Sequence, residues 1–208
     1  MKLDLFPGAV YLSDYISLSD QAALAVRCAS LGSLPAGLYT PTLKTGQSMS
    51  IQTMSMGLHW NPHTYSYGKF RDDYDGAEVV ALPEDLAELA SRVAQEAGFP
   101  SFSPDIGILN YYDETAKLGL HQDRSERRDT IERGSPVVSL SLGLSCNFVV
   151  GGLERTGPTR KVKLRSGDAF VFGGPSRSRF HGVTRVFPNT SPMELGLRGR
   201  YNLTFREY

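Results

Sequence analysis

The feature that most constrains the fold is an alternation of apolar and small polar residues between positions 138 and 145. The apolar members are Val138, Leu140, Leu142 and Leu144, and the small ones are Ser139, Ser141, Gly143 and Ser145. Successive side chains of a β-strand point to opposite faces, so this period of two predicts a half-buried strand. A helix would place the same apolar residues on opposite sides of its axis.

Similar short segments follow from residue 105 onward, separated by Gly, Pro and Asp turn signals. Their spacing is typical of a β-sandwich or barrel. The further expected strands are 106–112, 118–122, 148–150, 161–164, 168–172, 180–186 and 200–206. A double-sheet jelly roll fits this arrangement best.

Two amphipathic helices are expected in the first half of the chain. One covers residues 19–29, with Ser17 or Ser19 able to cap its start and Gly32 beyond its end. The other begins near Pro83 and ends at about residue 97, before a glycine. Both helices are expected to pack on the outside of a sheet.

The composition favours one soluble domain. The chain has 208 residues, of which 40% are hydrophobic, enough to bury one core. Cys28 and Cys146 show no disulfide spacing, and residues 1–4 lack the apolar character of a signal peptide. No apolar run approaches the roughly 20 residues that cross a bilayer. We therefore expect a cytoplasmic monomer with no membrane partner.

Charge is distributed unevenly, although the net charge is zero. Acidic residues predominate between positions 71 and 114, and basic residues between 151 and 206. The basic stretch includes Arg155, Arg160, Lys161, Lys163, Arg165, Arg177 and Arg179. These side chains could form a positive rim around a site for a phosphate-bearing substrate, or they could simply be a solvated face.

Three residues together could supply the ligands of a metal site. His121 and Asp123 are two positions apart, so at a strand end they point the same way. With His181 they supply two imidazoles and one carboxylate, the facial triad that leaves open positions on non-haem Fe(II). His59 and His63 are expected to be ordinary hydrogen-bonded residues of the core or surface.

The last predicted strand has one polar and one apolar face. Its polar face holds Arg200, Asn202, Thr204 and Arg206, and its apolar face holds Tyr201, Leu203 and Phe205. Two guanidinium groups inside a barrel would be costly unless each is paired with an anion. A dicarboxylate ligand would supply that pairing, at about 1.5–3 kcal/mol for each charged hydrogen bond. The alternative is a polar strand edge that faces solvent.

The chain resembles the AlkB family of Fe(II)/2-oxoglutarate-dependent nucleic-acid dealkylases, its bacterial members in particular. The similar segments are Asn110-Tyr111-Tyr112, Leu120-His121-Gln122-Asp123, Ser139-Leu140-Ser141-Leu142-Gly143-Leu144, Gly151-Gly152-Leu153-Glu154-Arg155, Gly167-Asp168, Gly173-Gly174, Phe180-His181-Gly182 and Arg200-Tyr201-Asn202-Leu203-Thr204-Phe205-Arg206. Residues 3–6 and 47–67 are also similar, so the resemblance spans most of the chain. The Arg-x-Asn-x-Thr-x-Arg run is more specific to this family than the triad is, because many oxygenases share the triad.

The resemblance implies a mainly β fold with flanking helices in a single domain, residues 1–208. Within it, residues from about 101 to 208 would form a double-stranded β-helix, or jelly-roll, core. Residues from about 1 to 100 would form an N-terminal nucleotide-recognition extension with helices and substrate-recognition loops.

The resemblance also implies the cofactor sites. His121, Asp123 and His181 would bind Fe(II), and Arg200 would bind the distal carboxylate of 2-oxoglutarate. The residues that complete the co-substrate pocket would be Asn110, Tyr112, Asn202 and Arg206, with Arg206 also contacting the metal-binding aspartate.

The implied activity is oxidative dealkylation of N-alkylated bases in DNA, a direct-reversal repair. It would consume O2 and 2-oxoglutarate and release an aldehyde, succinate and CO2. Alkylated single-stranded DNA is the expected partner, with RNA and duplex DNA left open.

Five residues are implied in substrate binding. Trp60 would stack on the damaged base, although a core role is its alternative. Tyr65 and Tyr67 lie near tyrosines that reach the nucleic-acid backbone in relatives, and which one corresponds is open. Arg155 could contact a phosphate or the base. Ser125 stands where bacterial relatives often have an acidic residue, which leaves open the preference among methylated adenine, methylated cytosine and etheno adducts.

Two other functions compete with this interpretation. One is an oxygenase of the same fold that hydroxylates a protein, a free amino acid or a small metabolite. The other is a non-catalytic nucleic-acid-binding module with a vestigial triad. The intact triad, together with Arg200 and Arg206, argues against the second.

Overall fold

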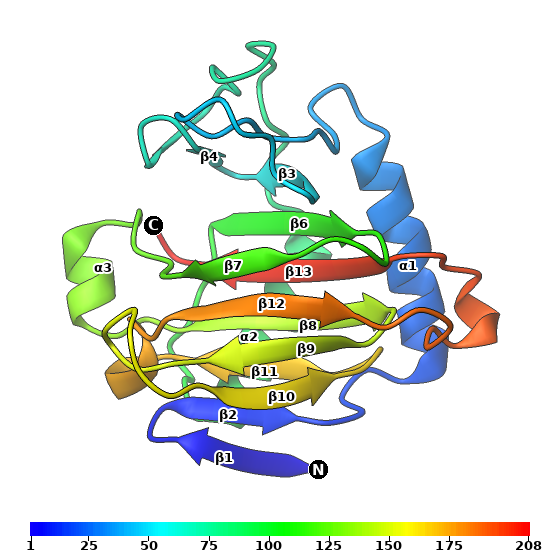
Figure 1. Ribbon diagram of the computed structural model, residues 1–208, viewed down its shortest axis with the longest axis vertical. Helices are drawn as coiled ribbons and strands as arrows, with labels where there is room; N and C mark the ends of the chain where they lie inside the picture. Colours follow the sequence, from blue (N-terminus) through cyan, green and yellow to red (C-terminus); the bar gives the residue numbers. More distant parts are fainter.

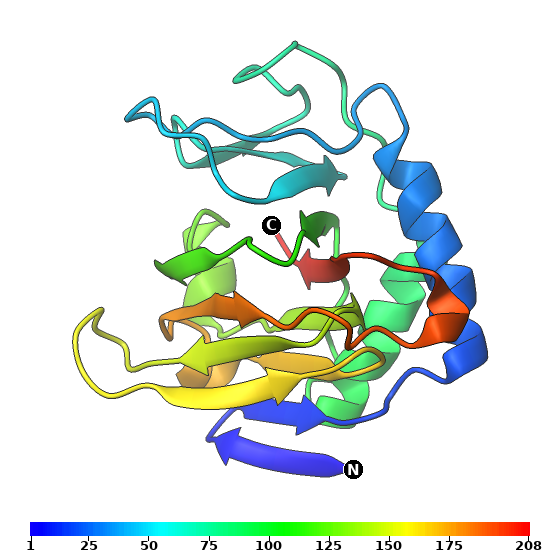
Figure 2. The same cartoon turned by 45° about the vertical axis from the view of Figure 1, so that its right-hand side comes forward.

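The computed structural model describes residues 1–208 and contains two antiparallel sheets that face each other (Figures 1 and 2). The strands are β1 (Lys2–Phe6), β2 (Ala9–Leu12), β3 (Gln52–Met56), β4 (His59–Asn61), β5 (Ser66–Gly68), β6 (Ile106–Tyr112), β7 (Leu118–His121), β8 (Val137–Gly143), β9 (Cys146–Val150), β10 (Arg160–Leu164), β11 (Ala169–Phe172), β12 (His181–Val186) and β13 (Arg200–Arg206). The fold is a jelly roll, as the sequence predicts.

The two sheets differ in size. The larger has seven strands in the order β1-β2-β11-β8-β13-β6-β3, and the smaller has four in the order β10-β9-β12-β7. A separate hairpin, β4–β5, lies above the open end of the two sheets, at the top of Figure 1. Strands β1 to β3 join the larger sheet, so the first part of the chain and the jelly roll share one sheet.

Two helices cover the outer face of the larger sheet, on the right of Figure 2. They are α1 (Leu18–Gly32) and α2 (Glu84–Ala97). Ser17 caps α1 by accepting a hydrogen bond from the Asp20 amide at 3.2 Å. Gly98 ends α2 in the left-handed conformation, with φ of 100°. Both predicted helices are therefore confirmed.

The end of α1 differs from the prediction. Gly32 is the last helical residue rather than a residue beyond the helix. A Cβ at this position would lie 2.9 Å from the Leu38 side chain. The glycine therefore permits close approach of the following segment, and Ser33 closes the helix by donating to the Ala29 carbonyl at 2.9 Å.

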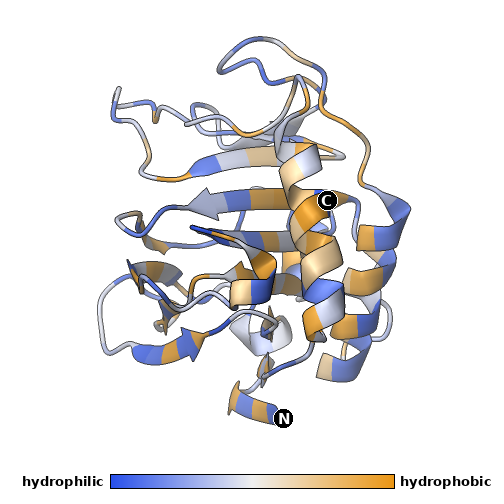
Figure 3. Ribbon diagram, turned by 90° about the vertical axis from the view of Figure 1, so that its right-hand side faces the viewer, coloured by the Kyte–Doolittle hydropathy of each residue, from blue (hydrophilic) through white to orange (hydrophobic).

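The molecule has two apolar cores, one on each face of the larger sheet. The first lies between that sheet and the helices and includes Leu24, Val93 and Leu140. The second lies between the two sheets and includes Phe148 and Phe170. The strands accordingly show alternating hydrophobic and hydrophilic bands in Figure 3. The short remaining helices are α3 (Arg128–Glu132), η1 (Gly174–Ser176) and η2 (Met193–Leu195).

Strand β8 departs from its prediction in one respect. The alternation predicts a half-buried strand, but every residue of β8 is buried. Ser139 and Ser141 are covered because the smaller sheet folds over this face, so the small polar side chains face the interior. Gly143 ends the strand at φ 82°, where a Cβ would lie 2.3 Å from the Gly199 carbonyl oxygen.

Strands β6 and β13 have the predicted bounds, and the other strands predicted from residue 106 onward differ from their predicted ranges by one or two residues at one or both ends. No bounds were predicted for β1 to β5. Strand β13 is paired on both sides, with β6 and β8, which excludes the solvent-facing edge considered above. None of the helices combines the length and the apolar character needed to span a membrane.

We expect Leu140→Ala to lower the free energy of unfolding by about 2–5 kcal/mol, because the side chain is fully buried in the helix-facing core. Urea denaturation measures the change. Met193→Ala is the control, since Met193 is 93% exposed, and should change stability by less than about 0.5 kcal/mol. Equal losses in both variants would contradict this assignment of the core.

Candidate functional site

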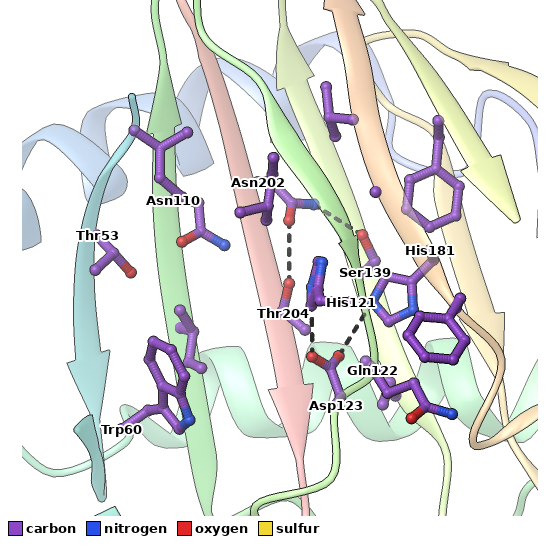
Figure 4. A pocket seen from close by; sticks show the side chains of 18 of the residues that line it. Thr53, Trp60, Asn110, His121, Gln122, Asp123, Ser139, His181, Asn202 and Thr204 are labelled. Atoms are coloured by element: carbon purple, nitrogen blue, oxygen red, sulfur yellow. Dashed lines mark hydrogen bonds and ion pairs between the residues drawn. The ribbon is translucent and has the colours of Figure 1, made fainter. Parts of the chain in front are cut away.

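A cavity of about 630 Å³ opens between the two sheets. Its walls combine apolar side chains from the inter-sheet core with polar side chains of β6, β8 and β13 (Figure 4). All four polar residues predicted for one face of β13 line it, while the apolar face packs in the helix-facing core. The alternation rule therefore placed both faces of this strand correctly.

The predicted metal ligands meet in this cavity. His121 ends β7 and His181 begins β12, and the two are paired in register. Asp123 follows β7, with its carboxylate oxygens 3.6 Å from His121 Nε2 and 3.5 Å from His181 Nε2. One ligand atom from each residue lies within 4.8 Å of the others. These three side chains could hold one divalent metal ion.

The second nitrogen of each imidazole is already engaged. Nδ1 of His121 is 2.8 Å from the Gly119 carbonyl oxygen, and Nδ1 of His181 is 3.0 Å from the Arg179 carbonyl oxygen. A carbonyl accepts but cannot donate, so each Nδ1 carries the proton. The lone pair of each Nε2 is then directed to the shared centre, as in metal-binding histidines.

Electrostatics keep His121 and Asp123 in the protonation states that bind a metal. Burial, and then the neighbouring His181, lowers the pKa of His121 to about 4. Burial alone would raise the pKa of Asp123, but Arg206 and His181 hold it well below its ordinary range. At neutral pH His121 is therefore neutral and Asp123 is ionised, which are the forms that bind a metal.

A buried ionic network surrounds the Asp123 carboxylate. Arg206 Nη2 is 2.8 Å from Asp123 Oδ1, and Arg206 Nη1 is 3.4 Å from Glu126 Oε1. Arg177 Nη2 lies 2.9 Å from the other oxygen of Glu126, and Arg177 Nη1 donates to the Asp123 carbonyl. The contact expected between Arg206 and Asp123 is thus present. Arg177, however, belongs to this network and not to a positive rim, because it is buried.

Arg200 contrasts with Arg206, although both lie on β13. Its side chain is buried, with only 1% of the residue exposed. It donates to Ser141 Oγ at 2.9 Å and makes a long contact with the Leu144 carbonyl at 3.5 Å. Its Nε has no partner, and no carboxylate lies within ion-pair distance. A desolvated cation without a counter-ion, facing a cavity, indicates a site for an anionic ligand.

Polar side chains of β13 and β8 lie beside the candidate metal ligands, among them Asn202, Thr204 and Ser139 (Figure 4). Asn202 donates to Ser139 Oγ at 2.8 Å and accepts from Thr204 Oγ1 at 3.0 Å. Asn110 lies opposite Asn202 in the register of β6 and β13 and also lines the cavity. Tyr112, opposite Arg200, lines it too. The structure therefore brings together all the residues predicted for a co-substrate pocket.

The wall nearest the hairpin carries aromatic side chains. Trp60, on β4, lines the cavity, and its Nε1 donates to Ser125 Oγ at 3.1 Å. Tyr65 packs edge-on against it, with ring centroids 6.0 Å apart, and is 58% exposed. Arg155 is exposed and also lines the cavity. Four of the five predicted substrate residues therefore line the cavity, and three of them, Trp60, Tyr65 and Ser125, contact one another in pairs.

Tyr67 lies elsewhere. It is opposite Trp60 in the hairpin register, but its hydroxyl accepts from Arg206 Nη1 at 2.6 Å and donates to Glu126 Oε1 at 3.2 Å. Tyr67 thereby connects the hairpin to the ionic network. Of the two tyrosines considered above, only Tyr65 has a side chain at the cavity.

Two further members of the site, Glu126 and Arg177, are not identifiable from the sequence. Each has the local sequence context of an ordinary surface charge, because its partner lies far away in the chain. The alternation in β8 assigns Ser139 to a polar face, but no local signal indicates that this face lines the cavity.

Comparisons with known proteins place the chain among oxygenases. The family model described as the 2OG-Fe(II) oxygenase superfamily matches residues 8–206. The chain is 40% identical over 220 residues to the DNA N(6)-methyladenine demethylase ALKBH1D of Arabidopsis thaliana, covering 97% of this chain and 50% of that protein. It is 36% identical over 207 residues to the alpha-ketoglutarate-dependent dioxygenase AlkB of Salmonella typhimurium, covering 98% and 91%.

A solved structure of OsALKBH1 matches with a TM-score of 0.91 and 38% identity, covering 100% of both chains. The chain spans about half the length of the Arabidopsis thaliana relatives ALKBH1D and ALKBH1C, 50% and 49% respectively.

We expect His181→Ala to weaken binding of a divalent metal such as Co(II) by at least about 100-fold. Loss of an outer-sphere partner alone typically costs 10–100-fold, and His181 is placed as a direct ligand. Calorimetric titration measures the affinity. His63→Ala is the control, because the His63 ring contacts only the Thr42 carbonyl and lies outside the triad. Retained affinity in the His181 variant would disprove the ligand set.

Proposed function

The chain belongs to the 2OG-Fe(II) oxygenase superfamily, and on that basis we propose that it removes N-linked alkyl groups oxidatively from the bases of DNA. The observation that carries this proposal is one cavity with three distinct parts. It contains a cluster of metal ligands, a buried unpaired guanidinium, and an aromatic wall at Trp60. Relatives named as DNA demethylases and as AlkB support the substrate class.

The residues present fit the two implied groups. His121, Asp123 and His181 would hold Fe(II) through two neutral imidazoles and one carboxylate. Arg200 would bind the distal carboxylate of 2-oxoglutarate, which would supply the counter-ion that its buried side chain lacks. Asn110, Tyr112 and Asn202 would line the rest of this pocket, and Arg206 would keep Asp123 ionised.

When bound, Fe(II), 2-oxoglutarate and O2 supply the oxidising chemistry. In the net reaction one oxygen atom enters succinate and the other enters a hydroxyl group on the alkyl carbon, and CO2 is released. A hydroxymethyl group on a base nitrogen then leaves as formaldehyde, which restores the base. The protein orients the co-substrate and directs the target carbon toward the metal site.

Substrate binding is assigned to the aromatic wall. The target base would leave the stack and enter the cavity, where Trp60 would stack against it. Ser125, held next to Trp60, would face the edge of the base. Tyr65 and Arg155 would contact the strand at the cavity mouth, where both are exposed. Stacking contributes roughly 1–3 kcal/mol for each base.

The proposal also covers the roles of the two parts of the chain, the type of nucleic acid, the cellular compartment and the oligomeric state. Residues from about 1 to 100 would supply the substrate-recognition loops, and residues from about 101 to 208 the catalytic jelly roll. Single-stranded DNA is the proposed substrate, with RNA as the second to be compared. We further propose that the protein acts as a cytoplasmic monomer.

The direct test supplies Fe(II), 2-oxoglutarate and one oligonucleotide sequence that carries methylated adenine, methylated cytosine or an etheno adduct. We expect formaldehyde release and loss of the alkyl mass from at least one methylated base. Succinate release without base repair would instead indicate an oxygenase for a protein or metabolite. Binding of the strand without any turnover would indicate a non-catalytic module.

Ser125→Asp is the matched variant for lesion preference. It restores the acidic residue of the bacterial relatives next to Trp60, and a carboxylate changes both the charge and the hydrogen-bonding capacity at the base edge. We expect the order of initial rates on the three lesions to differ between the wild type and this variant. Identical profiles would remove Ser125 from the determinants of specificity.

Arg200→Met should raise the KM for 2-oxoglutarate by about 100-fold, since loss of a charge-assisted bidentate contact costs on the order of 3 kcal/mol. Steady-state succinate formation measures this constant. Arg198→Met is the control, because Arg198 is exposed two positions before Arg200 and does not line the cavity. An equal effect of both variants would indicate nonspecific electrostatics rather than a carboxylate site.

A further inference from the structure

The β4–β5 hairpin carries Trp60 but belongs to neither large sheet. Adjacent residues of a strand point to opposite faces, so His59 points away from the cavity that Trp60 lines. Behind the hairpin, the side chains of His59 and Asp73 are each only 1% exposed and are joined by a hydrogen bond between His59 Nε2 and Asp73 Oδ1. The other ring nitrogen, Nδ1, has no partner, so Asp73 is the only hydrogen-bond partner of the ring.

Asp73 is itself held by a second donor. Tyr39, which precedes β3, donates its hydroxyl to Asp73 Oδ2 at 2.9 Å. Arg71 stacks over the Tyr39 ring at 4.6 Å and donates to the Gly37 carbonyl at 2.7 Å. We call His59, Asp73, Tyr39 and Arg71 the rear anchor. It joins β4 to two loops that are distant in the sequence.

The protonation of the rear anchor agrees with this geometry. Burial lowers the pKa of His59, and the ring is therefore neutral at physiological pH. Burial and the bond to Asp73 raise the pKa of Tyr39, so its hydroxyl keeps its proton. Two neutral donors thus converge on one carboxylate in a dry environment, where a hydrogen bond to a charged group is stronger than average.

We propose that Asp73, acting through His59, is a positioning residue that sets the orientation of Trp60 in the cavity. The proposal rests on the stacking role given to Trp60 under the proposed function. On the cavity side, the Trp60 ring makes a single hydrogen bond, to Ser125 at 3.1 Å. The orientation of the Trp60 ring therefore depends on the position of β4, the strand that carries it. Without the charge of Asp73, the only hydrogen bond of the His59 ring becomes a weaker, neutral one, and β4 is held less firmly.

The test uses Asp73→Asn, which keeps the size of the side chain and removes its charge. Trp60 is the only tryptophan in the chain, so intrinsic fluorescence reports directly on its surroundings. We expect a shift in Trp60 emission and a rise of about tenfold in the KM for a methylated oligonucleotide, within the range of one lost stack. The affinity for 2-oxoglutarate should not change.

Asp168→Asn is the matched control. Asp168 is also fully buried and also accepts a hydrogen bond from a tyrosine, Tyr11, at 2.7 Å. It immediately precedes β11, outside the cavity lining, so its loss reports general destabilisation. Tyr39→Phe removes one donor of the rear anchor and is the second variant, should Asp73→Asn fail to fold. It should shift the emission in the same direction by a smaller amount.

Two outcomes would overturn the proposal. One is an unchanged emission and KM in Asp73→Asn, or in Tyr39→Phe if only that variant folds. The other is an equal shift in Asp168→Asn, which would indicate general loosening. The fluorescence comparison needs no turnover. If the wild type repaired no lesion, the proposed function would fail while the coupling of Asp73 to Trp60 would still be measured.

Discussion

The site depends on the ion pair between Arg206 and Asp123. A carboxylate in the interior of a jelly roll is penalised by several kcal/mol unless it is paired, and a metal ligand must remain ionised. Arg206 provides the pairing and also contacts Glu126, which Arg177 neutralises from the other side. The last strand, the loop after β7 and the segment before β12 are thus joined by one set of charges. The geometry of the ligands follows from it.

The two arginines of β13 show how one polar strand face can serve two purposes. Arg206 has its anionic partners within the protein, whereas Arg200 has none. Both are buried because β13 lies between β6 and β8 in the larger sheet and under the smaller one. An unpaired buried cation lowers the stability of the free protein, and we propose that an anionic ligand supplies the missing counter-ion of Arg200. Arg206 would then be a structural charge and Arg200 a ligand-binding charge.

The hairpin that carries Trp60 is fixed from two sides. Tyr67, on β5, reaches the charges around Arg206, and His59, on β4, reaches Asp73 behind. A short two-stranded sheet is marginally stable by itself, so these contacts determine where the aromatic wall stands. Because Tyr67 contacts the same arginine that pairs with Asp123, the aromatic wall and the candidate metal site share one support.

The sequence by itself determined the strands from residue 106 onward and the candidate metal ligands, since both follow from local spacing. A period of two identified β8 and both faces of β13, and the His121–Asp123 spacing with His181 identified the triad. Only the tertiary structure decided that the serine face of β8 is buried, because a second sheet covers it. It also decided that Arg177 pairs with Glu126 and that His59 binds Asp73. Such pairs join residues that are distant in the chain. The periodicity of a sequence indicates only the face on which a side chain lies, and it does not indicate what packs against that face.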